Sequence, residues 1–181
     1  MRIDRREMLL GGGSLATLLA LRLVARATES VRQIMMIGDN RGAHVGFDPI
    51  GLLVKPGETV RWVNADKGNS HTTTAYHPDY FERVQRIPGS ASPWDSELLL
   101  PGETFEWEFS VPGVYDYYCI PHEHAGMVGR IVVDGAGAGT WSNYEGGADI
   151  PKAALSRLPS VAEILYSGEV HQTPDDAGAG E

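Results

Sequence analysis

Three side chains able to bind a metal ion lie within one short stretch of the sequence. Cys119, His122 and Met127 follow one another with the spacing Cys-x2-His-x4-Met, inside residues 117–128. A second imidazole, His71, lies far upstream, after a Gly-Asn-Ser loop and at the start of an expected strand. A loop between two strands can fold a thiol, an imidazole and a thioether toward one point. The spacing therefore predicts a metal site.

The types of these side chains indicate which metal. Two histidines and one cysteine in a plane, with a weak axial methionine, form the ligand set of blue-copper sites. Thiolate selects copper over harder ions, and the distant thioether tunes the reduction potential. A site acceptable to both Cu(I) and Cu(II) needs little rearrangement, which favours rapid transfer of single electrons. Zinc could occupy the cysteine and two histidines, but structural zinc sites usually recruit four strong ligands.

The numbers of cysteine and histidine residues in the chain support this interpretation. Cys119 is the single cysteine, and in an oxidising compartment an unpaired thiol is reactive unless a metal bond holds it. Six histidines are present, too few for a trinuclear copper cluster. We interpret four of them as structural or surface residues: His44, His77, His124 and His171. Of these four, His124 is the one alternative to His122 as a ligand.

The N-terminal segment has the features of an export signal. Arg5-Arg6 precedes a short uncharged run from Met8 to Leu21, which is too short to span a bilayer. Ala25-Arg26-Ala27 is a small-x-small cleavage site. The arginine pair resembles a twin-arginine signal. We therefore predict a twin-arginine-type signal peptide over residues 1–27 and a periplasmic or otherwise extracytoplasmic location.

The charge of the chain limits its partners. Removing residues 1–27 takes away five of the 15 basic and two of the 24 acidic side chains, which changes the formal net charge from −9 to −12. A strongly acidic protein repels nucleic acid and anionic lipid and favours partners with basic faces. We expect no nucleic-acid partner and no stable membrane insertion after signal removal.

Short extended segments separated by turns fill residues 28–134. Phe105, Trp107 and Phe109 alternate with glutamates, as in a half-buried strand. Residues 77–101 are rich in proline and glycine and are expected to be irregular. This pattern predicts an all-β domain, an antiparallel sandwich with Greek-key connections. The expected strands cover residues 31–37, 44–54, 58–64, 71–76, 105–109, 115–119 and 128–133.

The C-terminal part differs from the preceding domain in composition and in its expected secondary structure. Residues 135–168 are predicted to hold a Gly-rich linker and then two short helices, broken at Pro159, that pack on the sandwich. Ser160 and Glu163 form a capping box for the second helix. Residues 169–181 are predicted to be disordered. The apolar stripe expected to face the sandwich comprises Leu155, Leu158, Val161, Ile164 and Leu165.

The stretch after the last tyrosines resembles the ligand loop of plastocyanins, with cysteine, proline, histidine, glycine and methionine at Cys119, Pro121, His122, Gly126 and Met127. The stretch 66–68 before His71, and the trailing helices, are similar to pseudoazurins. The resemblance covers roughly residues 31–134. It departs at Thr72, where the family often has asparagine, and no match is assigned over residues 77–100.

The resemblance implies a cupredoxin-like Greek-key β-sandwich with a short C-terminal helical extension. It also implies one type 1 copper per chain, with His71, Cys119, His122 and Met127 as ligands. The expected function is that of an exported blue-copper electron carrier and not of an enzyme, because all copper positions are filled. The expected partners are redox proteins such as cytochromes or copper/quinone enzymes. The chain is expected to be a monomer.

Two other functions stay open at this point. The first is a copper-binding carrier or delivery protein, which needs an exposed and exchangeable site. The second is a small copper enzyme resembling one domain of a nitrite reductase, for which no second set of histidines is visible. Within the carrier hypothesis, His122 is expected to show its ring edge at the surface, His71 is expected to be covered, and Tyr118 is the second candidate for the electron exit.

Overall fold

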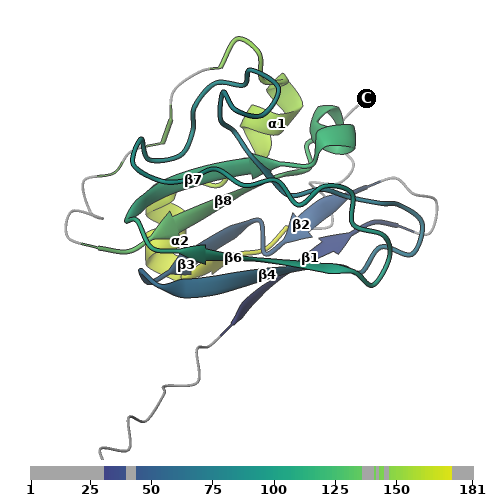
Figure 1. Cartoon of the computed structure of the whole chain (residues 1–181), viewed down its shortest axis with the longest axis horizontal. Coiled ribbons are helices and arrows are strands. Elements are labelled where there is room, and N and C mark those ends of the chain that lie inside the picture. The colour runs from purple at the N-terminus through teal and green to yellow at the C-terminus, as the bar shows by residue number, and fades with distance from the viewer. Residues whose placement is uncertain (1–30, 40–43, 136–140, 142, 145–146, 173–181) are drawn as a thin grey trace, which may run out of the picture.

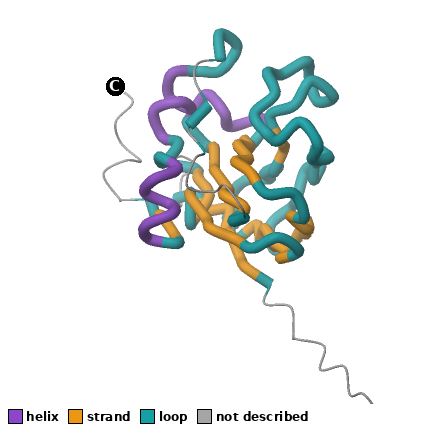
Figure 2. Tube along the Cα trace, turned by 90° about the vertical axis from the view of Figure 1, so that its left-hand side faces the viewer, coloured by secondary structure: helices purple, strands orange, loops and turns teal. Residues whose placement is uncertain are grey.

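The computed structural model describes residues 31–39, 44–135, 141, 143–144 and 147–172. Within these residues two β-sheets pack face to face, and two short helices lie on the outer side of one of them (Figures 1 and 2). The predicted signal segment 1–27 lies outside the described residues. No helix in the described ranges has the length and apolar character needed to cross a bilayer.

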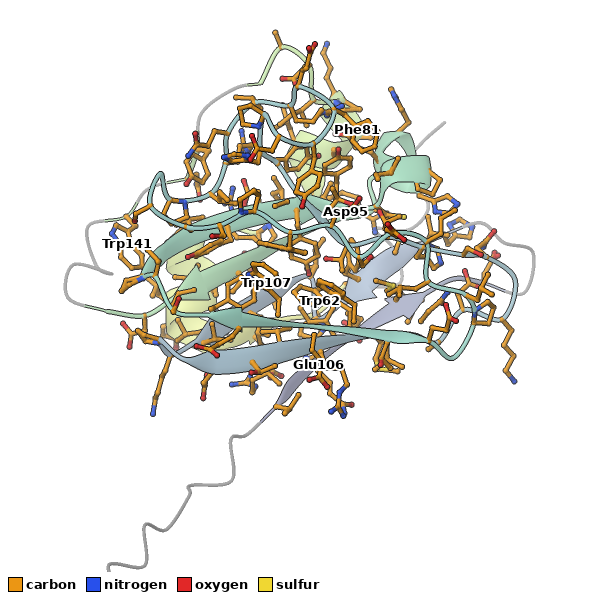
Figure 3. The ribbon with its side chains drawn as sticks, in the orientation of Figure 1. Trp62, Phe81, Asp95, Glu106, Trp107 and Trp141 are labelled. Carbon is orange, nitrogen blue, oxygen red and sulfur yellow. The ribbon has the colours of Figure 1, made fainter. Side chains whose placement is uncertain are left out.

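The first sheet has four strands in the order β2-β1-β4-β6. Its inner face is aromatic, because alternate side chains of β4 and β6 point into the sandwich. Trp62 and Trp107 lie between the sheets, whereas Glu106 points away from them (Figure 3). The strands are Arg32–Ile37 (β1), Gly46–Asp48 (β2), Glu58–Asn64 (β4) and Thr104–Phe109 (β6).

The second sheet has five strands in the order β5-β7-β8-β3-β9. On β7 the alternation sends Tyr115, Tyr117 and then Cys119 into the core between the sheets, and Val114 and Tyr118 to the outer face. The strands are Gly51–Val54 (β3), Thr74–Ala75 (β5), Gly113–Tyr118 (β7), Val128–Val133 (β8) and Glu169–Val170 (β9).

The predicted strand over residues 44–54 is wrong as a single element. The chain forms β2 in one sheet and β3 in the other, with Pro49 between them. Proline cannot donate a ladder hydrogen bond, so it suits a crossing point better than a strand interior. The predicted antiparallel sandwich also contains two parallel pairs, because β1 pairs with β4 and β3 pairs with β8 in parallel.

The two predicted helices are present as α1 (Lys152–Arg157) and α2 (Val161–Ser167), separated at Pro159. Ser160 Oγ accepts a hydrogen bond from the Glu163 N–H, as the capping box predicted. The helices pack on the outer face of the five-stranded sheet, α2 through Val161 and Ile164. The predicted disordered tail is corrected at its start, since Glu169 and Val170 pair with β3. Residues 173–181 lie outside the described part.

Residues 77–100 form the predicted irregular excursion, and buried side chains attach it to the sandwich. Trp94 is 1 % exposed and its ring centroid lies 5.8 Å from that of Trp62. Arg86 donates to Asp116 on β7 at 2.8 Å, and Arg130 on β8 donates to the same buried carboxylate. The end of the excursion then runs back beside residues 71–75, on the segment that carries His71.

Candidate metal centre

His71 lies on a short extended segment just ahead of β5. Its backbone N–H donates to Leu99 O at 3.1 Å, and its carbonyl accepts from the Leu99 N–H at 2.8 Å. The excursion over residues 77–100 therefore clamps the ligand segment from one side, and β7 pairs with β5 on the other. The His71 side chain is completely buried.

Cys119 and His122 come from the connection between β7 and β8. Cys119 directly follows β7 and is the N-cap residue of a short 3-10 helix, η1 (Ile120–Ala125), which has Pro121 in its first turn. The carbonyl of Cys119 accepts from the His122 N–H at 3.1 Å. Gly126 ends the helix at φ 81°, a left-handed conformation that favours glycine, and so turns the chain into β8.

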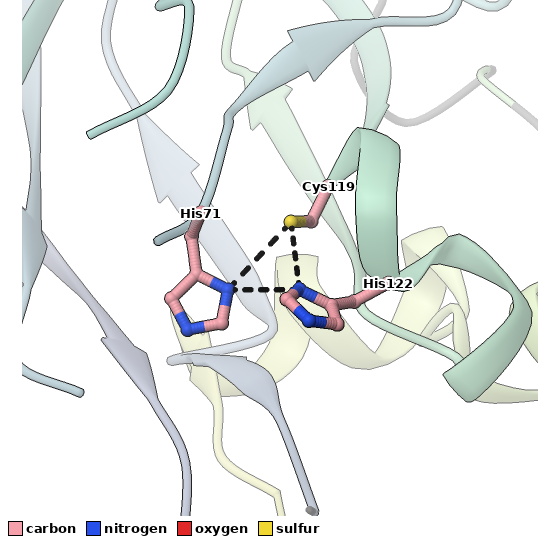
Figure 4. A group of neighbouring side chains, drawn as sticks. All are labelled: His71, Cys119 and His122. Carbon is pink, nitrogen blue, oxygen red and sulfur yellow. Dashed lines mark hydrogen bonds between the residues drawn. The ribbon is translucent and has the colours of Figure 1, made fainter. Parts of the chain in front are cut away.

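The three predicted ligand atoms face one another (Figure 4). Cys119 Sγ lies 3.6 Å from His71 Nδ1 and 3.4 Å from His122 Nδ1, and the two nitrogens are 3.1 Å apart. An ion bound to all three through bonds of about 2.0–2.3 Å needs donors about 3.5 Å apart. The triangle fits one small metal ion. Within the described ranges it is the one cluster of three or more His, Cys, Asp or Glu side chains able to share an ion.

The protonation states of these groups suit a metal site. Burial lowers the pKa of His71, against the opposing effect of Asp66, and burial followed by the charge of His71 lowers the pKa of His122. Both shifts favour the neutral imidazole, which is the form that binds a metal. Burial raises the pKa of the Cys119 thiol to about 11, so in the metal-free chain this group keeps its proton.

Met127 lies in the core next to the ligand loop. It is completely buried and packs in the same apolar cluster as Cys119. Its carbonyl accepts from the Cys119 N–H at 3.0 Å, and its own N–H donates to His122 O at 3.1 Å. The backbone thus ties the three loop residues together, while the role of Met127 as fourth ligand stays a prediction. His124, the alternative to His122, is exposed on η1 and outside the cluster.

The sequence analysis did not predict two residues that contact the expected ligands. Thr72, noted there only as a departure, donates its N–H to Cys119 Sγ at 3.4 Å and accepts from the Ile120 N–H through Oγ1 at 2.9 Å. Asp66 Oδ2 lies 3.0 Å from His71 Nε2. The signal available for Asp66 was an acidic residue five positions ahead of a ligand histidine, which by itself does not indicate a contact.

The surface above the site is partly apolar. His122 is half-buried, and Pro121 and Ala125 beside it are exposed. Leu98, from the excursion, is 61 % exposed and lines a hollow together with Ile120 and Pro121. By contrast Tyr118 is only 2 % exposed, with its ring stacked on another tyrosine, so it does not present an alternative route at the surface.

Comparison with known proteins decides the family. The model of copper-binding proteins of the plastocyanin/azurin family matches residues 34–134. The chain belongs to this family. The predicted cupredoxin-like sandwich and copper as cofactor are thereby confirmed, and the cluster of His71, Cys119 and His122 matches a type 1 copper site.

Individual relatives agree with this assignment. The chain is 37 % identical over 129 residues to the chloroplastic plastocyanin of Chlamydomonas reinhardtii, covering 71 % of this chain and 82 % of that protein. It is 30 % identical over 126 residues to the pseudoazurin of Methylorubrum extorquens, covering 69 % and 75 %. A solved Sinorhizobium pseudoazurin superposes with a TM-score of 0.53 at 27 % identity, covering 76 % of this cupredoxin and 97 % of that chain.

Proposed function

We propose that this cupredoxin is an electron carrier that holds one copper ion through His71, Cys119, His122 and Met127. The observation that carries the proposal is the buried triangle of two Nδ1 atoms and one Sγ, with edges of 3.1–3.6 Å. Copper bound there would gain and lose one electron by alternating between Cu(II) and Cu(I). The similarity to proteins named plastocyanin and pseudoazurin supports the same conclusion.

The chain's own residues keep the triangle rigid. Thr72 connects the segment of His71 to the start of η1 through its Oγ1, and its N–H reaches the cysteine sulfur. Leu99 pairs with His71 through two backbone hydrogen bonds. Because these hydrogen bonds hold the segments of the ligands against one another, the donor atoms have little freedom to move. A frame of this kind limits the rearrangement that accompanies a change of oxidation state.

Electrons are proposed to enter and leave through the edge of His122. His71 is completely buried and His122 is half-buried, so the second imidazole is the ligand nearest to solvent. Leu98 and Pro121 line a hollow whose wall also includes Asp95 and Glu97, and Ala125 is exposed on η1 with His122. We propose that these apolar side chains provide the docking area. The acidic body of the chain steers redox partners with basic faces toward it.

Delivery of copper is the second candidate function, and the burial of the donors opposes it. A delivery site exchanges its metal through an accessible ligand set, whereas His71 and Cys119 are both 0 % exposed. An enzyme resembling a nitrite reductase domain requires a further metal or substrate site. Outside the triangle, the described ranges hold no other cluster of three or more metal-binding side chains.

We also propose that the carrier is exported. The support is the arginine pair Arg5-Arg6, the uncharged run after it and the small residues at 25–27. Replacing both arginines by lysine keeps the charge and is expected to leave uncleaved precursor in the cytoplasm. Normal export of the double variant would rule out a twin-arginine route.

One measurement series tests the function. The chain loaded with Cu(II) is expected to show an intense thiolate-to-copper absorption band, the electron-spin spectrum of a type 1 site, and a reversible one-electron midpoint potential with fast self-exchange. Rapid loss of copper to a chelator, without reversible cycling, would favour delivery. Turnover of nitrite would favour the enzyme.

A further inference from the structure

A buried carboxylate lies directly behind the innermost ligand. Asp66 is 3 % exposed, and its Oδ2 lies 3.0 Å from Nε2 of His71, the ring nitrogen on the far side from Cys119. His122 differs, since no described residue hydrogen-bonds to its Nε2. One of the two imidazoles is therefore braced by an anionic group and the other is not.

The chain builds a cradle for this carboxylate. Asp66 Oδ1 accepts from the Gly68 N–H at 2.7 Å, and Oδ2 accepts from Asn69 Nδ2 at 2.8 Å. The Asp66 N–H in turn donates to Asn64 Oδ1 at 3.0 Å. Both oxygens thus act as acceptors from N–H groups, which is the behaviour of an ionised carboxylate. Burial pushes the pKa of Asp66 up, but the hydrogen bonds from Asn69, Gly68 and His71 outweigh it and lower the pKa.

A glycine makes room for the cradle. A Cβ added to Gly38 would lie 2.0 Å from Asp66 Oδ2 and 2.7 Å from its Cγ. The carboxylate could not stay against His71 if any larger residue occupied this position. The space beside β1 is therefore part of what holds Asp66 in contact with the histidine.

We propose that Asp66 is a positioning residue of the copper site, which fixes His71 with its proton on Nε2 and favours Cu(II) through its negative charge. With the proton on Nε2, the lone pair of Nδ1 points into the triangle. The carboxylate also makes the imidazole a stronger donor. This inference rests on the proposed function, because it requires His71 to be a ligand.

The central test is the midpoint potential of Asp66→Asn, measured on the full copper-loaded chain. A unit charge about 7 Å from the ion, at an effective dielectric constant of about 20–30, changes the preference for Cu(II) over Cu(I) by about tenfold or more. For one electron, tenfold corresponds to about 59 mV. We expect Asp66→Asn to raise the potential by at least that amount, with the thiolate-to-copper band retained.

A matched control separates this effect from a general loss of charge. Asp79 carries the same group on the surface, with a side chain that is 71 % exposed. Its charge is screened by water and salt, so Asp79→Asn is expected to leave the potential unchanged. Equal shifts in Asp66→Asn and Asp79→Asn would overturn the proposal.

A second variant moves the carboxylate without removing it. Gly38→Ala is expected to push Asp66 away from His71 and to raise the potential in the same direction as Asp66→Asn. Nitrogen NMR of the histidine rings in the diamagnetic Cu(I) and metal-free forms reports the proton directly. We expect His71 to carry it on Nε2 in wild type, and its Nε2 shift to change in both variants.

The outcomes are distinguishable. If Asp66→Asn keeps its copper spectrum but has the wild-type potential, the proposal fails while the carrier function stands. If Asp66→Asn does not fold, two other results would overturn the proposal. One is a wild-type His71 that carries its proton on Nδ1 in the metal-free form, and the other is an unchanged midpoint potential in Gly38→Ala. If wild type lacks the charge-transfer band, the carrier function itself fails.

Discussion

The backbone N–H of Thr72 donates a hydrogen bond to Cys119 Sγ, at a distance of 3.4 Å. The Thr72 hydroxyl extends the same link, because Oγ1 accepts from the Ile120 N–H at 2.9 Å and lies 3.0 Å from Thr74 Oγ1. One residue thus connects the strand of the buried histidine to the loop of the other ligands. Where the family often has asparagine, a shorter polar side chain makes this connection here.

Replacing Thr72 by valine is expected to weaken the fold. Valine keeps the shape and the backbone N–H but leaves the part-buried Ile120 N–H without its acceptor, which costs about 0.5–1.5 kcal/mol in free energy of unfolding. Chemical denaturation of the metal-free chain measures the loss. Thr72→Ser keeps the hydroxyl and is expected to lose less. If valine and serine were equally stable, the hydroxyl contact would have no energetic weight.

Cys119→Ser is expected to abolish the intense visible absorption of the Cu(II) form. The reason is that Cys119 is the single thiol of the chain, so no other residue can supply thiolate-to-copper charge transfer. Absorption and electron-spin spectra measure the effect. His124→Asn, which alters an exposed residue of the same loop, serves as the control and is expected to keep the colour. A coloured Cys119→Ser variant would refute the ligand assignment.

Met127→Leu is expected to keep copper and raise its midpoint potential. Removing a weak thioether donor disfavours Cu(II) relative to Cu(I), while leucine preserves the volume of a completely buried side chain. Met35→Leu makes the same exchange on β1, outside the apolar cluster that contains Cys119. This control is expected to leave the midpoint potential unchanged. An unchanged potential in Met127→Leu would mean that this methionine is not a ligand.

Copper affinity is expected to rise with pH. Burial raises the pKa of the Cys119 thiol to about 11, so over the neutral range the metal must displace one proton from it. Each unit of pH increase then strengthens the apparent affinity about tenfold. The two imidazoles, whose pKa values are lowered, add no proton in this range. Competition with a Cu(I) chelator between pH 6.5 and 9 checks this, and a flat profile would contradict a protonated thiol.

Electron transfer to a basic partner is expected to depend on the apolar surface beside His122. Ala125→Glu and Leu98→Glu each place a charge within that surface and are expected to slow transfer even at high salt, with the copper spectrum intact. Tyr166→Glu is the control, because Tyr166 is 95 % exposed on α2 rather than beside the loop. Stopped-flow rates over a range of ionic strength measure both effects. Wild-type rates in both Ala125→Glu and Leu98→Glu would mean that electrons leave the protein at another place.

The acidic charge adds a separate salt dependence. The formal net charge of −12 without residues 1–27 attracts a basic partner over about 10 Å at 0.1 M salt, and this attraction weakens as salt shortens the screening length. Wild-type rates are therefore expected to fall as ionic strength rises. Rates independent of salt would show that docking, rather than steering, limits the reaction.

Local sequence was sufficient for the part of the site carried by one loop. Cys119 and His122 are separated by one turn of η1, so their spacing alone brings them together. The strand alternation of residues 105–109 and the capping of α2 at Ser160 were likewise predictable, because periodicity and capping depend on neighbours in sequence. These features were confirmed.

Only the tertiary structure decided which distant residues meet. Pro49 divides one extended stretch between two sheets, and this allows β3 to lie beside β8 in parallel, which no local pattern indicates. The same long-range packing brings Leu99 to His71, and its approach buries the histidine. Thr72 contacts the sulfur of Cys119 because two segments that are far apart in the sequence lie side by side. Residue types thus indicated the metal, whereas the backbone pairing of Leu99 with His71 and the contact of Thr72 with Cys119 arose between remote segments, whose register depends on the packed whole.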